Sequence, residues 1–138
     1  MSGGGLAMRT LPLRLPPGAE LREALQAVLR EQAVEAAFVI AGIGSLSVAQ
    51  LRLAGADTAQ TLRGDLEILT LGGSIAVDGV HLHASIADAD GRVWGGHVAP
   101  GCIVRTTAEL LLALLPNWHL GRASDPATGF AELTVRPR

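Results

Sequence analysis

Only one stretch of this chain has the apolar spacing of a helix, and most of the residues C-terminal to it have the composition of β-strands. Leu21, Leu25, Val28 and Leu29 recur at helical spacing, which predicts an amphipathic helix ending near Glu31. Beyond it, short apolar runs are separated by Gly or Asp-Gly, a pattern typical of strands joined by tight turns. The predicted strands are Ala33–Ile43, Ser47–Ala54, Gln60–Ala76, Val80–Ala87, Val93–Ala99 and Cys102–Thr107. We therefore expect an α+β fold: a mostly antiparallel β-sheet with one main N-terminal helix packed on it.

Three further segments add to this outline. Met8–Leu15 alternates apolar and polar residues and predicts an edge strand, because Pro12 has no N–H to donate to a ladder. The run 108–115 (AELLLALL) has helical propensity, but its short length and its neighbours favour a strand. The tail predicts a turn at Asp125-Pro126 and a short strand near Ala131–Val135.

The length and composition indicate one folded unit. The chain has 138 residues, of which 49% are apolar and 17% charged. We expect a single domain over residues 8–138, after a flexible, Gly-rich N-terminus at residues 1–7. No stretch approaches the ~20 apolar residues of a membrane span, and the N-terminus lacks the apolar core of a secretory signal. A cytoplasmic protein with no membrane association is therefore expected.

The charge distribution disfavours a nucleic-acid partner without excluding one. The chain has no lysine, its eleven arginines are scattered with no adjacent pair, and its formal net charge is −2. Binding to a phosphate backbone relies on clustered positive charge. The single cysteine, Cys102, lies in an apolar run and is predicted to be a buried, inert thiol.

The chemistry of the chain concentrates in the segment 79–98 (GVHLHASIADADGRVWGGHV), which contains three of its four histidines. His81 and His83 are two residues apart, so in a strand both side chains project from one face while Leu82 points to the other. His97 lies in the following strand. Whether it joins the pair depends on the turn between the two strands.

Two turns are compatible with the sequence, and they place His97 differently. If residues 90–91 form a two-residue loop, Ala84 faces His97 and the third imidazole points away from the pair. If residues 89–91 form a three-residue loop with a left-handed Gly91, His83 lies directly opposite His97 and all three histidines share a face.

In the second arrangement the sequence predicts a divalent metal site at His81, His83 and His97, with zinc first among the candidates. Three protein ligands leave one coordination position open for water or a substrate. The alternative is that the histidines are ordinary polar residues of an exposed sheet face. His119 is distant in sequence and is expected to be a surface or packing residue. Asp78 and Asp90 belong to turns and Asp88 ends a strand, so no general base is assigned and the sequence leaves open whether the protein is an enzyme.

Four sequence blocks carry a family resemblance: GDLEILTLGGSI, DGVHLHASIADADGRVWGGHV, RTTAEL and DPATGFAEL. In their order and wording the chain resembles the PPC domain, the plants and prokaryotes conserved domain also called DUF296, in its free-standing prokaryotic form. The resemblance covers about Met8 to Val135. It implies an antiparallel sheet flanked by a helix, a homotrimer, and a metal site formed by the motif histidines, which fall on His81, His83 and His97.

The resemblance leaves two functions open. The first is a small trimeric metal-binding protein that takes a small-molecule or protein ligand at the metal site. The alternative is a DNA-binding or regulatory protein-interaction module, as members of the family are often labelled. The DNA label comes from plant members with a separate AT-hook, and this sequence has no Arg-Gly-Arg core of that kind.

Overall fold

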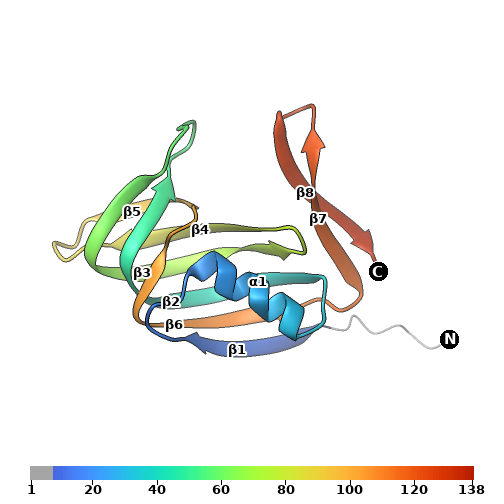
Figure 1. Ribbon diagram of the computed structural model, residues 1–138, viewed down its shortest axis with the longest axis horizontal. Coiled ribbons are helices and arrows are strands. Elements are labelled where there is room, and N and C mark those ends of the chain that lie inside the picture. Colours follow the sequence, from blue (N-terminus) through green and yellow to red (C-terminus); the bar gives the residue numbers. More distant parts are fainter. Residues whose placement is uncertain (1–7) are drawn as a thin grey trace.

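The computed structural model describes residues 8–138, so the predicted flexible N-terminus at residues 1–7 lies outside the described residues (Figure 1). In chain order the elements are β1 (Arg9–Leu15), α1 (Leu21–Glu31), β2 (Ala36–Arg52), β3 (Gln60–Ala76), β4 (Gly79–Ala87), β5 (Val93–Val98), β6 (Ile103–Leu114), β7 (Trp118–Asp125) and β8 (Phe130–Pro137). The predicted α+β class, an antiparallel sheet with one N-terminal helix, is confirmed.

Six strands form one sheet in the order β1-β6-β2-β3-β4-β5. β1 lies at an edge beside β6, as expected for a strand that contains Pro12. At the other edge, β5 pairs with β4 and also with the end of β2, where Arg52 lies opposite His97. The sheet therefore curls until its last strand meets a central one.

The helix covers one face of this sheet (Figure 1). Its N-terminus is capped by Glu20, whose carboxylate accepts a hydrogen bond from the backbone N–H of Glu23 over 2.8 Å. Leu21, Leu25 and Leu29 are buried on the side facing the strands. Burying each leucine contributes roughly 1.5–3 kcal/mol, which fixes the helix to the sheet. Within residues 8–138 no helix is both long and apolar enough to cross a bilayer.

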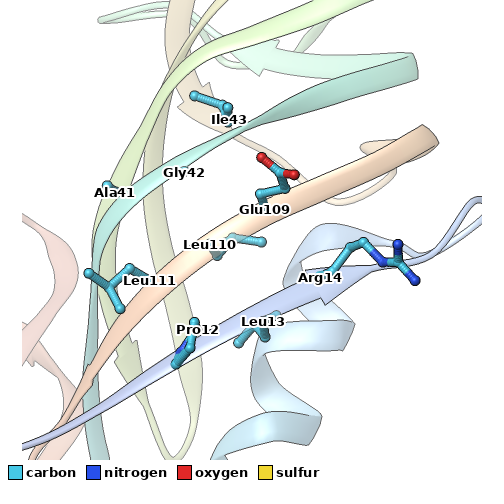
Figure 2. A pocket seen from close by; sticks show the side chains of 9 residues that line it. All are labelled: Pro12, Leu13, Arg14, Ala41, Gly42, Ile43, Glu109, Leu110 and Leu111. Atoms are coloured by element: carbon cyan, nitrogen blue, oxygen red, sulfur yellow. The ribbon is translucent and has the colours of Figure 1, made fainter.

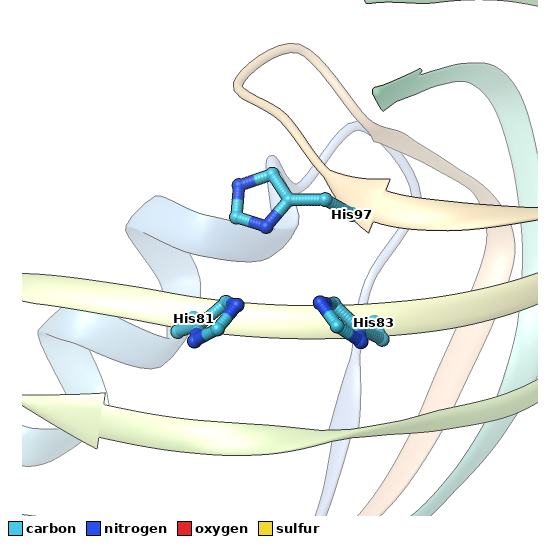
Figure 3. A group of neighbouring side chains, drawn as sticks. All are labelled: His81, His83 and His97. Carbon is cyan, nitrogen blue, oxygen red and sulfur yellow. The ribbon is translucent and has the colours of Figure 1, made fainter. Parts of the chain in front are cut away.

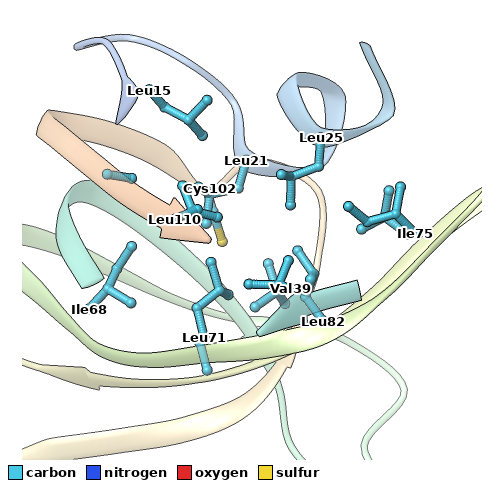
Figure 4. Close-up of a cluster of buried hydrophobic side chains, with 14 of the residues drawn as sticks. Leu15, Leu21, Leu25, Val39, Ile68, Leu71, Ile75, Leu82, Cys102 and Leu110 are labelled. Carbon is cyan, nitrogen blue, oxygen red and sulfur yellow. The ribbon is translucent and has the colours of Figure 1, made fainter. Parts of the chain in front are cut away.

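The core lies between this helix and the strands beneath it (Figure 4). Ile75 of β3 and Leu82 of β4 are fully buried there, together with Leu25 of the helix. Cys102 is also fully buried and accepts a hydrogen bond at Sγ from the backbone N–H of Gln50. Burial raises the pKa of the Cys102 thiol, in agreement with the expected inert side chain.

The predicted break between the strands at 33–43 and 47–54 is absent. The strands expected at Ala33–Ile43 and Ser47–Ala54 form one continuous strand, β2, interrupted only by bulges. Gly44 causes no turn there. It has a φ of 155° and lies against β6, where a side chain would meet the Ala108 Cα at 2.7 Å. The glycine therefore permits close strand contact within a bulged ladder.

The C-terminal half differs from expectation in a similar way. The segment 108–115 is strand, as favoured, but it continues directly from residue 103 as the single strand β6. β7 was not predicted, and it pairs with β8 along its whole length to form a separate hairpin. The strand expected at Ala131–Val135 lies within β8. Leu120 anchors the hairpin by packing in a small buried cluster with Ala36 and Ala76.

Candidate metal centre

A three-residue turn, residues 89–91, joins β4 to β5. Gly91 adopts a left-handed φ of 80°, and the backbone N–H of Asp88 donates to the carbonyl of Arg92 over 2.9 Å. The Asp88 carboxylate accepts hydrogen bonds from the backbone N–H groups of Asp90 and Arg92, each over 2.9 Å. This is the longer of the two turns compatible with the sequence, and it sets the pairing of the two strands.

The turn places His83 of β4 directly opposite His97 of β5. His81 lies on the same face, since Leu82 between them points into the core with 0% of its surface exposed. Figure 3 shows the three rings facing one another. The centroid of the His81 ring is 5.0 Å from that of His83 and 5.2 Å from that of His97, and the His83 and His97 centroids are 5.9 Å apart.

The geometry of this histidine cluster fits a metal ion. One nitrogen from each ring can be chosen so that all three lie within 4.8 Å of one another. Two nitrogens bound to one tetrahedral zinc at about 2.0–2.1 Å lie roughly 3.4 Å apart, so small side-chain rotations close the difference. Three neutral imidazoles suit zinc and other late divalent ions.

The surroundings of His81 and His97 favour the neutral imidazole, which is the form that binds metals. Burial, followed by the charges of His81 and Arg52, lowers the pKa of His97 to about 4. Burial and the charge of Arg122 also lower the pKa of His81. The neutral imidazole is therefore favoured at both positions at neutral pH, and a metal ligand has to be deprotonated.

Glycines bring the strands of this region close together. At Gly96 a side chain would meet the carbonyl oxygen of Arg52 at 2.9 Å, because β2 passes directly beside β5. At Gly73, where φ is 147°, a side chain would collide with the carbonyl oxygen of His81. Gly73 and Gly96 are thus explained by close backbone contact.

Two cavities adjoin the histidine cluster. The larger, of about 750 Å³, lies over β3 and β4, and Ser74, His81, His83 and Ser85 contribute to its lining. Leu133 of β8 closes one side of it. A second cavity of about 270 Å³ lies on the side of His97 and Arg52. The histidines therefore border space large enough for a small molecule.

The other residues considered from the sequence lie elsewhere. The Asp88 carboxylate accepts hydrogen bonds from the turn backbone and from Trp94, whose Nε1–H donates to it over 3.1 Å. His119 lies at the start of β7, where its Nδ1 is 3.0 Å from a carboxylate oxygen of Glu35. Asp78 accepts a hydrogen bond from a backbone N–H of β7. Asp90 forms an exposed ion pair with Arg92 at 3.8 Å.

Sequence reasoning missed the arginines near the cluster. Arg52 lies opposite His97 only because β5 closes onto β2, and Arg122 arrives from β7. No local pattern signals either contact, since both depend on how distant strands pair.

The comparisons with known proteins identify the family of the chain. The model of one family, described as the Plants and Prokaryotes Conserved (PCC) domain, matches residues 2–116. The chain belongs to this family. It is the family, also abbreviated PPC, that the sequence blocks resemble.

The chain is also similar to curated proteins and to solved structures. A "Bifunctional protein GlmU" from a Synechococcus strain is 48% identical over 131 residues, which are 95% of this chain and 21% of that protein. The chain thus spans about a fifth of the length of the curated relatives it matches. A hypothetical protein from Salmonella enterica has a TM-score of 0.91 and 36% identity, with 98% of each chain covered. A protein from Archaeoglobus fulgidus described as metal-containing has a TM-score of 0.80 and 26% identity, with 91% of this chain and 93% of that chain covered.

Proposed function

We propose that the protein binds one divalent cation per chain, zinc first among the candidates, through His81, His83 and His97. The observation that carries this proposal is that one nitrogen from each of the three rings lies within 4.8 Å of the other two. The lowered pKa of His97 supports it, because a neutral ring is ready to bind. The description of the Archaeoglobus fulgidus neighbour as metal-containing supports it as well.

The bound metal would supply Lewis acidity at an open coordination position, and the chain's own residues would select what binds there. Within residues 8–138 the group of clustered metal-ligating side chains contains only the three histidines and no carboxylate. We therefore propose a ligand-binding role and assign no reaction. The activity of the much longer GlmU relatives is not transferred to this domain.

The assembly we propose is a homotrimer, whose subunit number comes from the family resemblance. Support comes from the sheet face opposite the helix, where Phe38, Ile40 and Ile43 of β2 have 38%, 52% and 54% of their surface exposed. A neighbouring groove between β1, β2 and β6 is lined mainly by apolar residues, among them Leu13 and Leu111 (Figure 2). Covering such a surface with further copies of the chain removes it from water.

Elemental analysis of the purified, untagged protein tests the metal site. We expect about one zinc or similar ion per chain in the wild type, and loss of that ion in His81→Ala, His83→Ala and His97→Ala. His119→Ala is the matched control, because it removes the fourth histidine and leaves the cluster intact. A wild-type chain that holds no metal after reconstitution would overturn the proposal and favour the protein-interaction alternative.

A further inference from the structure

Arg122 is brought onto the face of the sheet that carries the histidines. Its guanidinium donates a hydrogen bond to Ser74 Oγ over 3.2 Å, and its backbone N–H is held by Asp78 over 3.2 Å. Ser74 lies directly opposite His81 in the pairing of β3 with β4, so the two side chains share a face. The β7–β8 hairpin therefore places the Arg122 guanidinium beside the histidine cluster.

The larger cavity adjoins the histidines and reaches Arg122 through Ser74. Ser74, which Arg122 contacts, is in its lining, as are His81 and His83. Leu133, the hairpin residue directly opposite Arg122, is in the lining too. At about 750 Å³ the cavity falls within the range of roughly 300–1,000 Å³ that is typical of small-molecule sites.

The charges around this space favour an anion. Arg122 donates to Ser74 in the lining of the larger cavity, and Arg52 lines the smaller cavity together with His97. Arg22 and Arg52 donate to backbone carbonyls, of Val98 over 3.1 Å and Ala56 over 3.4 Å. In the described part of the chain none of the three arginines forms a salt bridge, so their positive charge is not neutralised by a direct acidic partner.

Gly72 lines the larger cavity without placing a side chain in it. It lies directly opposite His83, and a side chain there would have one neighbour within 4 Å, the carbonyl oxygen of Val39 at 3.9 Å. The backbone therefore does not require glycine at this position for lack of room. A side chain at Gly72 would occupy the cavity itself.

We infer that this cavity binds a small anion, with Arg122 holding its carboxylate or phosphate group while the molecule reaches the histidine cluster. The inference rests on the proposed metal function, because a second oxygen of the ligand would meet the open coordination position. The guanidinium presents a planar set of donors that matches a carboxylate or phosphate, and the Ser74 and Ser85 hydroxyls add neutral donors. The ligand class is thus an oxyanion small enough for one cavity.

Isothermal titration with two probes, inorganic phosphate and citrate, tests the inference and separates the two anion classes. Each probe is titrated into zinc-loaded and metal-free wild type, Arg122→Gln and Arg105→Gln. Arg105 is the control, because it lies on β6 and its guanidinium is paired with Asp65 at 3.1 Å. We expect Arg122→Gln to weaken binding of the preferred probe by roughly 10-fold to 100-fold and Arg105→Gln to leave it unchanged.

A second variant, Gly72→Val, fills the cavity without touching Arg122. It is expected to abolish binding of the preferred probe while the protein keeps its melting temperature and its zinc content. Equal binding by wild type and Arg122→Gln, or no binding of either probe by wild type, would overturn the inference.

These measurements distinguish a failure of the proposed metal site from a failure of the proposed anion site. A wild-type chain without zinc that still binds phosphate or citrate in an Arg122-dependent way supports the anion site and contradicts the metal function. A zinc-loaded chain whose anion affinity is unchanged by both Arg122→Gln and Gly72→Val supports the metal function and contradicts the anion site.

Discussion

The indole N–H of Trp94 donates a hydrogen bond to the carboxylate of Asp88 over 3.1 Å, across the turn that joins the two histidine strands. The other carboxylate oxygen accepts from the backbone N–H groups of Asp90 and Arg92. One side chain therefore holds both ends of the turn. Because that turn sets the pairing of His83 with His97, the metal site depends on a residue that does not belong to it.

Removing this carboxylate is expected to weaken the metal site. Asp88→Ala leaves the turn without its three side-chain hydrogen bonds, so His97 is held less firmly opposite His83. We expect the zinc affinity to fall by roughly tenfold, similar to the loss of an outer-shell partner. Competition with a chromophoric chelator measures it. Asp90→Ala, which removes an exposed ion pair at the same turn, is the control, and equal affinities in the two variants would refute this role.

The same contact predicts how stability changes in acid. The hydrogen bond from Trp94, followed by those from the backbone of Arg92 and Asp90, lowers the pKa of Asp88. A carboxylate with a lowered pKa in the folded state stabilises the fold fully above its unfolded pKa, about 3.9, and less as the pH falls through the folded value. Thermal melts of wild type and Asp88→Asn should therefore differ at pH 7 and converge as the pH falls through the lowered pKa of Asp88. A constant difference at all pH values would contradict the assignment.

Two adjacent glycines should respond in opposite ways to alanine. At Gly73 a side chain collides with the backbone of His81, so Gly73→Ala is expected to destabilise the fold by more than about 3 kcal/mol. Gly72→Ala has room and should change the unfolding free energy by less than about 1 kcal/mol. Urea denaturation measures both. Similar losses in the two variants would show that strand propensity, not the β3–β4 contact, determines the effect.

The fourth histidine is expected to hold the hairpin rather than a metal. The hydrogen bond from His119 lowers the pKa of Glu35, and Arg138 lies 3.5 Å from the same carboxylate oxygen. His119→Ala should speed backbone hydrogen exchange in β7 and β8 several-fold while zinc content stays constant. Unchanged exchange in the hairpin would show that Leu120 and its apolar cluster suffice to hold it.

The proposed trimer predicts the effect of charge on the open sheet face. Ile43→Glu places a carboxylate where we expect a neighbouring copy, so light scattering should give the mass of one chain instead of three. Val93→Glu is a matched control on the β4–β5 side, since Val93 is also largely exposed, at 60%. A trimer that survives Ile43→Glu unchanged would place the interface elsewhere.

The sequence predicts the helix, most of the strands and the pairing of neighbouring strands better than it predicts contacts between distant strands, such as that of β5 with β2. Counting along the sequence yields two possible turns between the histidine strands and leaves the choice between them open. The structure has the three-residue turn at residues 89–91 with a left-handed Gly91, on which the histidine geometry depends. The predicted break at Gly44 is wrong because a glycine in a close strand contact has the same local signature as one in a turn. Arg122 was missed because β7 shows no alternating pattern and reaches Ser74 only through the folded hairpin.

X-ray absorption at the zinc edge of the loaded protein is the sharpest test of the histidine site, because it counts the imidazoles around the metal. We expect three histidine nitrogens at about 2.0–2.1 Å in the wild type and in His119→Ala, and two or loss of the metal in His83→Ala. A sulfur neighbour at about 2.3 Å, which would come from Cys102, or a spectrum unchanged by His83→Ala, would contradict the three-histidine site.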